Sequence, residues 1–560
     1  MWFIKHRLQL EINCEAHTCI IMETITSFVI STGQCYMLFK ESTQKEELSE
    51  TVRAVISTCI CAFVYDVVFR NVRPNGYVPQ AFRDVKGPGL CYLFLVPVAF
   101  LVSHGVKISD YLVSAHFTIA LVSFSILHQF LILLYLNPPR NQQIMRIWHV
   151  IAILPWILTL FVQIAYTFLK LGIYWTIALY IGAGIGCSMQ WLVAHYFPKS
   201  FTLSEGAILA QSILLFSWQS FSSLKEAMKN VEANDKIYIF TEVAALSTLM
   251  VFVLLVLFKK LRTAIMFHCT LVFVALFFAL PALQLTLQQN FVLWMFNHII
   301  SDRINVILFA FWTLICGSCV GLVIIIYSSL AQSTDLTHQQ GPVLQNGFAI
   351  QQNQNAADAN ANNRISTRTR KYFHVIAIIT FVPGLYYNVT LTMCAATCGC
   401  IVFCMLECIR FLNIAPFGGT LNEYLNVFRE EQDRGELILT PIYLLTGFTL
   451  PLWFSQSSTT CHLALFSGVI SLGIGDSAAS WFGSKFGQSK WPNSRRSQEG
   501  TVAFIVACLA SVWWLTKLGV VIEHSTMKVT LAIVLTALVE AFTSQVDNLV
   551  LPLFMYVLLA

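Results

Sequence analysis

The chain has 560 residues, of which 56% are hydrophobic and only 11% are charged, and its mean hydropathy is +0.67. Soluble domains usually carry about 25% charged residues, so this composition excludes an ordinary soluble globular protein. The formal net charge of +5 is modest and is spread over the segments between the apolar runs. This distribution fits the positive bias of cytoplasmic loops and gives no indication of nucleic-acid binding.

Long apolar segments recur along the whole chain, among them residues 90–106, 151–169, 237–258 and 304–327. A helix needs roughly 20 apolar residues to cross the hydrocarbon core of a bilayer, and it satisfies its own backbone hydrogen bonds there. Length alone predicts about 13 to 15 spans. The expected fold class is all-α, a polytopic transmembrane helical bundle.

One segment, residues 332–369, breaks this pattern because it is rich in Gln, Asn and Ala and poor in large apolar side chains. Such a segment buries too little apolar surface to offset the entropy of ordering. We therefore expect a disordered linker at 332–369. It would separate an N-terminal transmembrane bundle, residues 1–331, from a C-terminal transmembrane core, residues 370–560.

Glu205 is one of two carboxylates that stand out near span ends in the N-terminal half; the other is Glu242. Thr202 or Ser204 can cap a helix whose first turn contains Glu205, where a carboxylate stabilises the helix dipole. This structural role is the favoured interpretation of Glu205, and a functional role is the alternative.

The first charged residues of the C-terminal half are Arg370, Lys371 and His374, at the start of a span that Pro383 interrupts. Basic residues in this position can anchor a span by snorkelling to the membrane surface; a role in a site is the alternative. Further along, Glu407 and Arg410 are three residues apart and can pair on one helix. Asp433 is a further carboxylate candidate, for which a solvated loop charge is the favoured interpretation.

Residues 475–501 form a polar loop between two apolar runs. The loop contains two carboxylates (Asp476 and Glu499), four glycines (Gly475, Gly483, Gly487 and Gly500) and four cations (Lys485, Lys490, Arg495 and Arg496). A loop of this composition at the edge of a bilayer has the groups needed to hold a polyphosphate and its metal ion. The absence of a Gly-x4-Gly-Lys-Ser/Thr sequence excludes a P-loop by motif.

A helix that runs from Ile474 would place Asp476, Ser480, Gly483 and Gly487 along one stripe. The Asp476 carboxylate can hold Mg²⁺, and the bare glycine backbone can admit phosphate oxygens. The four cations would then lie within reach of the triphosphate charge. The alternative is a contact of Gly483 and Gly487 with a second helix, beside a basic anchor loop.

A second polar group lies in the last apolar segment, where Glu540, Thr543, Ser544 and Asp547 follow helical spacing. We expect these residues to share one face of a helix that continues towards Pro552. Two carboxylates at membrane depth are costly unless they meet a cation, a metal ion or water. This face is therefore predicted to point towards Asp476, where it would complete a metal site or accept the proton of a substrate hydroxyl.

These residues together resemble the CTP-binding segment of the dolichol kinases. The matching residues are Gly475-Asp476-Ser477-Ala478-Ala479, Gly483, Gly487, Lys490-Trp491-Pro492 and Gln498-Glu499-Gly500-Thr501. Supporting matches lie at residues 370–374, 416–419, 439–445 and 540–548, and a weaker one at 197–202. The chain departs from the family at Ser477, where Thr is frequent, and at Arg495-Arg496-Ser497, where a Lys-Lys-Thr type run is expected. The same core resembles the polyprenol and phytol kinases more loosely.

The resemblance implies a multi-pass enzyme of the endoplasmic reticulum membrane that uses CTP and Mg²⁺ to phosphorylate dolichol for protein glycosylation. Its partners would be CTP, dolichol and membrane lipids, and its nucleotide site would face the cytosol. The implied catalytic residues are Asp476, Glu540 and Asp547, and the implied metal ligands are Asp476 and Glu499. The implied nucleotide-binding residues are Gly475, Ser480, Gly483, Lys485, Gly487, Lys490, Arg495, Arg496, Glu499, Gly500 and Thr501.

Two other functions remain open at this point. A CTP-using lipid cytidylyltransferase would release pyrophosphate and leave CMP on the lipid. A multi-span transporter would couple its intramembrane carboxylates to ions, but it gives the cationic loop no use, and no internal repeat is visible in the sequence.

Overall fold

The computed structural model describes a helical protein. The described residues are 82–83, 95–104, 117–118, 120–121, 124, 143–227, 235–287, 290–339, 367–426, 429, 433, 435–454, 462–491, 494–522, 524–543 and 546–560. Every regular element within these ranges is a helix, which confirms the predicted all-α class. Seven helices in this part of the chain are long and apolar enough to cross a membrane. The predicted total also counts residues 1–81, which lie outside the described residues.

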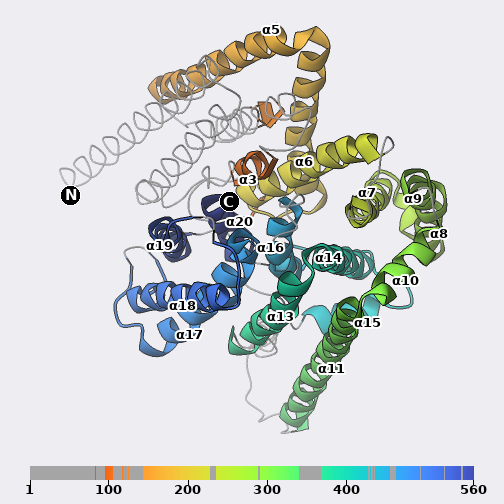
Figure 1. Ribbon diagram of the computed structural model, residues 1–560, viewed down its shortest axis with the longest axis vertical. Coiled ribbons are helices and arrows are strands. Elements are labelled where there is room, and N and C mark those ends of the chain that lie inside the picture. The colour runs from red at the N-terminus through yellow and green to blue at the C-terminus, as the bar shows by residue number, and fades with distance from the viewer. Residues whose placement is uncertain are drawn as a thin grey trace, which may run out of the picture.

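In Figure 1 most helices of the first half lie along the top, the right and the bottom of the view, and α3 lies next to α20. Its helices are α3 (Leu95–His104), α5 (Gln143–Tyr196), α6 (Leu203–Ala227), α7 (Asp235–Leu257), α8 (Ala264–Val274), α9 (Leu280–Leu287), α10 (Phe291–Ser301) and α11 (Arg303–Gln339). Helix α5 bends sharply at Gly172, whose φ of 79° is a backbone conformation that favours glycine. The four apolar runs named above all contain helix, as their length predicts.

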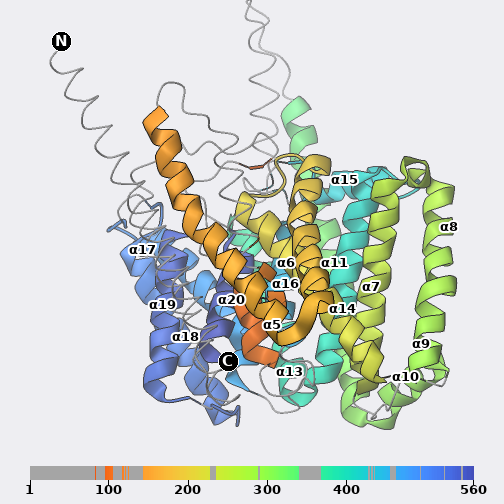
Figure 2. The same ribbon diagram turned by 90° about the horizontal axis from the view of Figure 1, so that it is seen from above.

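The second half supplies the centre of the fold. Its helices are α13 (Thr367–Tyr387), α14 (Val389–Phe411), α15 (Gly418–Asn426), α16 (Thr440–Phe454), η5 (Val469–Asp476, a π-helix), α17 (Ser477–Phe486), α18 (Gln498–Lys517), α19 (Thr526–Phe542) and α20 (Asp547–Leu559). Figure 2 shows many of these helices running side by side, as expected of a membrane bundle. Helix α20 is buried from Asn548 to Val557 and packs against α3, α16, α19 and η5.

The largest hydrophobic cluster joins the two halves of the chain. It contains Leu95 and Phe100 of α3 together with Leu472 of η5 and Leu551 of α20. Helices α11 and α13 also extend into both ends of the expected linker, up to Gln339 and from Thr367. The remainder of that segment, residues 340–366, lies outside the described residues.

Two buried carboxylates hold the segment before α16. Asp433 accepts hydrogen bonds from the Leu439 N–H (3.0 Å) and the Thr440 hydroxyl (2.8 Å), so it caps the start of α16. The interpretation of Asp433 as a solvated loop charge is therefore wrong, since its side chain is buried. Glu407 pairs with Arg410 at 2.6 Å, as its spacing predicts, and also accepts the Ile438 N–H at 2.7 Å.

Helices α16 and α20 approach each other closely at Gly447. A Cβ atom there would collide with the Asn548 carbonyl oxygen and would lie 3.1 Å from both Leu472 Cδ2 and Pro552 Cγ. Because the neighbours are a backbone atom and a proline ring, they cannot move away at low cost. The crossing of these two helices therefore requires glycine.

We expect Gly447→Ala to destabilise the protein by about 1–3 kcal/mol, the usual cost of overpacking. Gly321→Ala is the matched control, because nothing lies within 4 Å of a Cβ atom at this position in α11. The control should be neutral or slightly stabilising, because alanine favours helix. Thermal unfolding of the detergent-solubilised variants measures both, and an unchanged melting temperature for Gly447→Ala would contradict the packing argument.

Candidate active site

Five segments meet in one charged centre. The start of α13, the end of η5, the loop between α17 and α18, the end of α19 and the start of α20 each contribute at least one charged side chain. The residues are Lys371, His374, Asp476, Arg496, Glu540 and Asp547. We call this group the charged centre.

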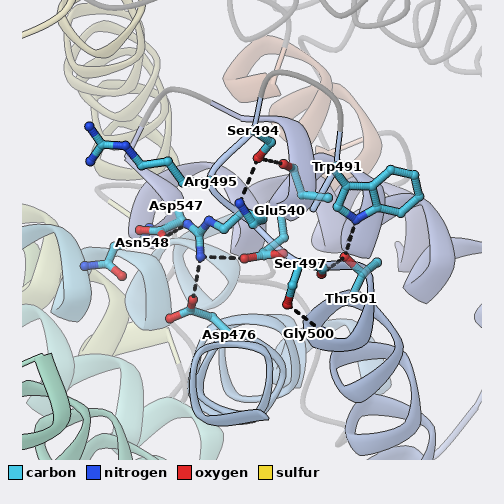
Figure 3. A network of polar contacts seen from close by, with 12 residues as sticks. Asp476, Trp491, Ser494, Arg495, Ser497, Gly500, Thr501, Glu540, Asp547 and Asn548 are labelled. Atoms are coloured by element: carbon cyan, nitrogen blue, oxygen red, sulfur yellow. Dashed lines mark hydrogen bonds and ion pairs between the residues drawn. The ribbon is translucent and has the colours of Figure 1, made fainter. Parts of the chain in front are cut away.

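Arg496 lies between three carboxylates. Its Nη1 atom is 2.6 Å from Glu540 Oε1 and 3.8 Å from Asp476 Oδ1, and its Nη2 atom is 2.9 Å from Asp547 Oδ2. Figure 3 shows Asp476, Glu540 and Asp547 turned towards this guanidinium. Burial alone would lower the pKa of Arg496, but the three carboxylates raise it above its usual range. The side chain therefore remains charged.

Helix α13 supplies the cations on the other side of Asp476. The Lys371 ammonium donates a hydrogen bond to Asp476 Oδ2, and His374 Nε2 lies 3.6 Å from the same oxygen. Asp476 is only 2% exposed, whereas the Lys371 side chain is 23% exposed. The charged centre thus combines three carboxylates with the cations Lys371 and Arg496, and His374 lies beside Asp476.

Close packing of η5 against α18 positions Asp476. The π-helix η5 ends at Asp476, and α17 begins at the next residue. A Cβ atom on Gly475 would lie 2.7 Å from the Phe504 ring and 2.8 Å from Cys508 Sγ, both on α18. Glycine at 475 therefore permits the approach of η5 to α18.

Hydrogen bonds of Ser494 and Ser497, on either side of Arg496, hold this part of the loop. Ser497 caps α18 by accepting the Gly500 N–H at 3.2 Å. Ser494 donates from its hydroxyl to the Ala541 carbonyl at 2.7 Å and accepts the Arg496 N–H at 3.1 Å. The loop is thus attached to α18 and to α19, which presents Glu540 to the same guanidinium.

The predicted glycine stripe has a packing role. A Cβ atom on Gly483 would lie 2.9 Å from Ser497 Oγ, and one on Gly500 would lie 2.9 Å from the Ala479 carbonyl oxygen. Gly487 likewise faces Ser497. These contacts support the alternative interpretation, in which small residues let α17 and α18 pack closely. Ser480 is half-buried on the same helix.

Only one of the four predicted cations joins the charged centre. Lys485 is exposed and lies over the Trp481 and Phe486 rings, at 5.1 and 5.3 Å from their centroids. Lys490 donates to the Arg495 carbonyl at 3.0 Å, and the Arg495 side chain points away from Asp476 in Figure 3. These three side chains lie on the exposed surface of the loop, outside the set of contacts around Arg496.

Glu499 and Thr501 hold the loop together. The Glu499 carboxylate accepts the backbone N–H groups of Gln488 (3.2 Å) and Ser489 (2.9 Å). Thr501 accepts a hydrogen bond from the Trp491 indole at 2.9 Å. Both contacts of Glu499 use Oε1, whereas Oε2 is buried without a hydrogen-bond partner, so the role of Glu499 as a metal ligand stays a prediction.

The predicted continuous helix from Glu540 to Pro552 is wrong. Helix α19 ends at Phe542 and α20 begins at Asp547, so Glu540 and Asp547 belong to different helices. The two carboxylates nevertheless face Arg496 from two sides. Ser544 lies outside the described residues.

Sequence reasoning did not include Lys371 and His374 among the site residues. Their basic segment at the start of a span was ambiguous, because an anchor and a site have the same composition there. The available signal was the need for a cation beside Asp476, since a buried carboxylate requires a partner.

The carboxylates of the charged centre fit Mg²⁺ only together with ligands from a substrate. Among the described residues, no group of three or more His, Cys, Asp or Glu side chains is arranged to hold a metal ion by itself. Mg²⁺ usually binds through one or two carboxylates plus substrate phosphates. Glu540 Oε1 is buried and touches Arg496 without accepting an aligned hydrogen bond, so it has capacity for a further partner.

Exposed aromatic side chains mark both ends of α18. Trp481, Phe482 and Phe486 are exposed on α17, whose Gly483 packs against the start of α18, and Trp513 and Trp514 are exposed near the end of α18. Tryptophan is enriched at both membrane–water interfaces, and the 20 residues of α18 give a length of about 30 Å, close to the hydrocarbon thickness. We therefore expect Arg496, two residues before α18, to lie near one membrane surface.

The fold and the site define an integral membrane protein of the helical class, with a charged centre next to the start of α18. The family model described as Dolichol kinase matches residues 342–509. A dolichol kinase of Bos taurus is 30% identical over 388 residues, which cover 66% of this chain and 67% of the relative. A dolichol kinase of Mus musculus is 32% identical over 53% of each chain, and one of Arabidopsis thaliana is 35% identical over 34% of each.

No solved structure matches the chain. The relatives confirm the resemblance seen in the sequence: the chain belongs to the dolichol kinase family.

We expect Arg496→Ala to destabilise the fold by about 2–4 kcal/mol, because it leaves the buried carboxylates of Asp476 and Glu540 without their shared cation. Arg495→Ala is the matched control, since it removes an adjacent exposed arginine and should change stability by less than about 0.5 kcal/mol. Thermal unfolding in detergent compares the two. Equal melting temperatures would show that the ion pairs around Arg496 contribute nothing.

Proposed function

We propose that this protein transfers the γ-phosphoryl group of CTP to the terminal hydroxyl of dolichol. Family membership supports a dolichol kinase, and the observation that carries the proposal is the charged centre at the membrane surface. Enzymatic phosphoryl transfer depends mainly on positioning and on neutralising charge. The charged centre contains cations for the phosphates and carboxylates for a metal ion and a hydroxyl proton.

The cations of the centre have a clear use in this reaction. Lys371 and Arg496 now pair with carboxylates and are partly exposed, so both can turn towards the phosphate oxygens of a bound nucleotide. Arg suits bidentate phosphate contacts, and Lys acts as a point charge. The exposed Lys485, Lys490 and Arg495 would add a positive approach to the site.

Asp476 is the proposed metal ligand, with Glu540 as the second carboxylate in reach of Arg496. Mg²⁺ held there would neutralise charge that develops on the phosphate oxygens. A metal ion on Asp476 would replace Lys371 as the partner of that carboxylate, so Lys371 would become available to phosphate, while Arg496 would keep its contacts with Glu540 and Asp547.

The proton of the lipid hydroxyl needs an acceptor, for which Asp547 and Glu540 are the candidates. The dolichol oxygen forms a bond to the γ-phosphorus, the bond from that phosphorus to the β-phosphate oxygen breaks, and CDP leaves. The hydroxyl proton passes to the carboxylate. A site at the level of the membrane surface suits an acceptor whose chain lies in lipid and whose hydroxyl lies at the interface.

The same proposal implies an orientation and a location for the protein. CTP is a cytosolic nucleotide, so the charged centre and its exposed cations would face the cytosol, in keeping with the positive-inside rule. The expected location is the endoplasmic reticulum membrane, where dolichyl phosphate supports protein glycosylation.

In detergent, wild-type protein with Mg²⁺, dolichol and γ-labelled CTP should produce labelled lipid. Asp476→Asn should lower kcat/KM at least about 100-fold, because it removes the carboxylate between the two cations. Asp433→Asn is the matched control, a buried aspartate that caps α16 outside the site. A comparable loss in the control would refute a special role for Asp476.

The position of the label decides between the competing functions. Label from the α-phosphate in the lipid would indicate a cytidylyltransferase, and a preference for ATP or GTP would exclude CTP as the donor. A folded protein that binds no CTP and labels no lipid would favour the transporter.

Lys371→Met should raise the KM for CTP about 10-fold or more, because it removes a cation that would contact phosphate. Lys371→Arg should retain much of the affinity. The matched control is Lys517→Met, which removes an exposed lysine over the Trp513 ring at the far end of α18. Steady-state kinetics with varied CTP distinguish the variants, and an unchanged KM in Lys371→Met would exclude a phosphate contact.

A further inference from the structure

A buried ion pair between Arg83 and Glu205 lies next to the charged centre. Arg83 Nη2 donates to both carboxylate oxygens of Glu205, at 2.7 and 2.8 Å, and the two side chains are 5% and 0% exposed. Arg83 also donates to the Ser200 carbonyl at 3.4 Å, and its backbone N–H donates to the Phe201 carbonyl at 2.7 Å. These contacts fix the segment before α6.

Glu205 and Thr202 cap α6 reciprocally. The Thr202 hydroxyl accepts the Glu205 N–H at 3.2 Å, and the Glu205 carboxylate accepts the Thr202 N–H at 3.1 Å. This is a capping box, so the favoured structural interpretation of Glu205 is confirmed and Thr202 is the cap residue.

The same carboxylate reaches a second helix. Glu205 Oε1 accepts the backbone N–H of Val546 at 3.3 Å, across 341 residues of sequence. Val546 is the N-cap of α20, and its apolar side chain makes no capping hydrogen bond. The first N–H groups of a helix need acceptors from elsewhere, and a negative charge is favourable there. Glu205 therefore acts at the start of α20 as well as α6.

The next residue after Val546 belongs to the charged centre. Asp547 accepts a hydrogen bond from Arg496 Nη2 at 2.9 Å, and Arg496 in turn contacts Glu540 and Asp476. Glu205 belongs to the N-terminal half of the chain, but its hydrogen-bond partner Val546 directly precedes Asp547, a carboxylate of the site.

The segment that contains Glu205 is attached to the C-terminal core at two further places. A Cβ atom on Gly435 would collide with Ser200, so the two backbones are in close contact. The Phe197 and Phe411 rings meet edge to face with centroids 5.3 Å apart. These contacts hold Glu205 in place relative to α20.

We propose that Glu205 is a positioning residue, which fixes the start of α20 through the Val546 amide and so holds the Asp547 carboxylate against Arg496. The kinetic part of its test rests on the proposed function. By this arrangement the N-terminal half of the chain contributes to the geometry of the site.

The test uses full-length protein in detergent and the variants Glu205→Gln, Asp547→Asn, their double variant and Glu407→Gln. Glu407→Gln is the matched control, because Glu407 also pairs with a buried arginine and accepts a backbone N–H. Glu205→Asp is the second variant, which keeps the charge opposite Arg83 and shortens the reach to Val546.

We expect Glu205→Gln to lower kcat/KM about 10-fold, with the same division between kcat and KM for CTP as in Asp547→Asn. The double variant should fall no more than about 2-fold below Asp547→Asn, since residues that act through one contact are not additive. Multiplicative losses, or an equal loss in Glu407→Gln, would overturn the proposal.

Amide hydrogen exchange gives a readout that needs no activity. Peptides that cover residues 543–549 should exchange faster in Glu205→Gln and Glu205→Asp than in wild type or Glu407→Gln. Unchanged exchange in a folded Glu205 variant would refute the positioning role. If wild-type protein phosphorylates no lipid, the proposed function fails, and the exchange result still decides the role of Glu205.

Discussion

The site depends on the ion pairs between the Arg496 guanidinium and three carboxylates. Its three carboxylate partners come from η5, α19 and α20, so one side chain fixes the relative positions of three helix ends. A carboxylate that is buried in the protein without a partner costs several kcal/mol. The helices around α20 are therefore constrained by charge at one end and by close apolar packing along their length.

Residue type and hydropathy predicted much of this arrangement. The helical class, the approach of Glu540 and Asp547 to Asp476, and a cap at Thr202 or Ser204 follow from the cost of charges in lipid and of unpaired helix ends. The break between α19 and α20 was not predictable from spacing, because 540 and 547 also fit one continuous helix. Composition also could not show whether Lys371 is a membrane anchor or a site residue, because that depends on its contact with Asp476 in the folded protein.

Buried carboxylates recur in this fold as acceptors for backbone N–H groups of other segments. Glu205 serves Val546, Glu407 serves Ile438, and Asp433 serves Leu439. The N–H groups before and at the start of a helix need acceptors, and these buried carboxylates supply them. A carboxylate in an apolar sequence therefore does not by itself indicate a catalytic role. Its backbone partners, Leu439 for Asp433 and Val546 for Glu205, are visible only in the folded protein.

The π-helical turn before Asp476 has a consequence for insertions and deletions. A π turn contains one more residue than an α turn, and one residue of helix corresponds to a rotation of about 100°. Loss of a single residue within Val469–Asp476 is therefore absorbed when the segment winds as α-helix, whereas one further inserted residue would turn Asp476 away from Lys371. The helical register of this segment is thus as important to the charged centre as the identity of its side chains.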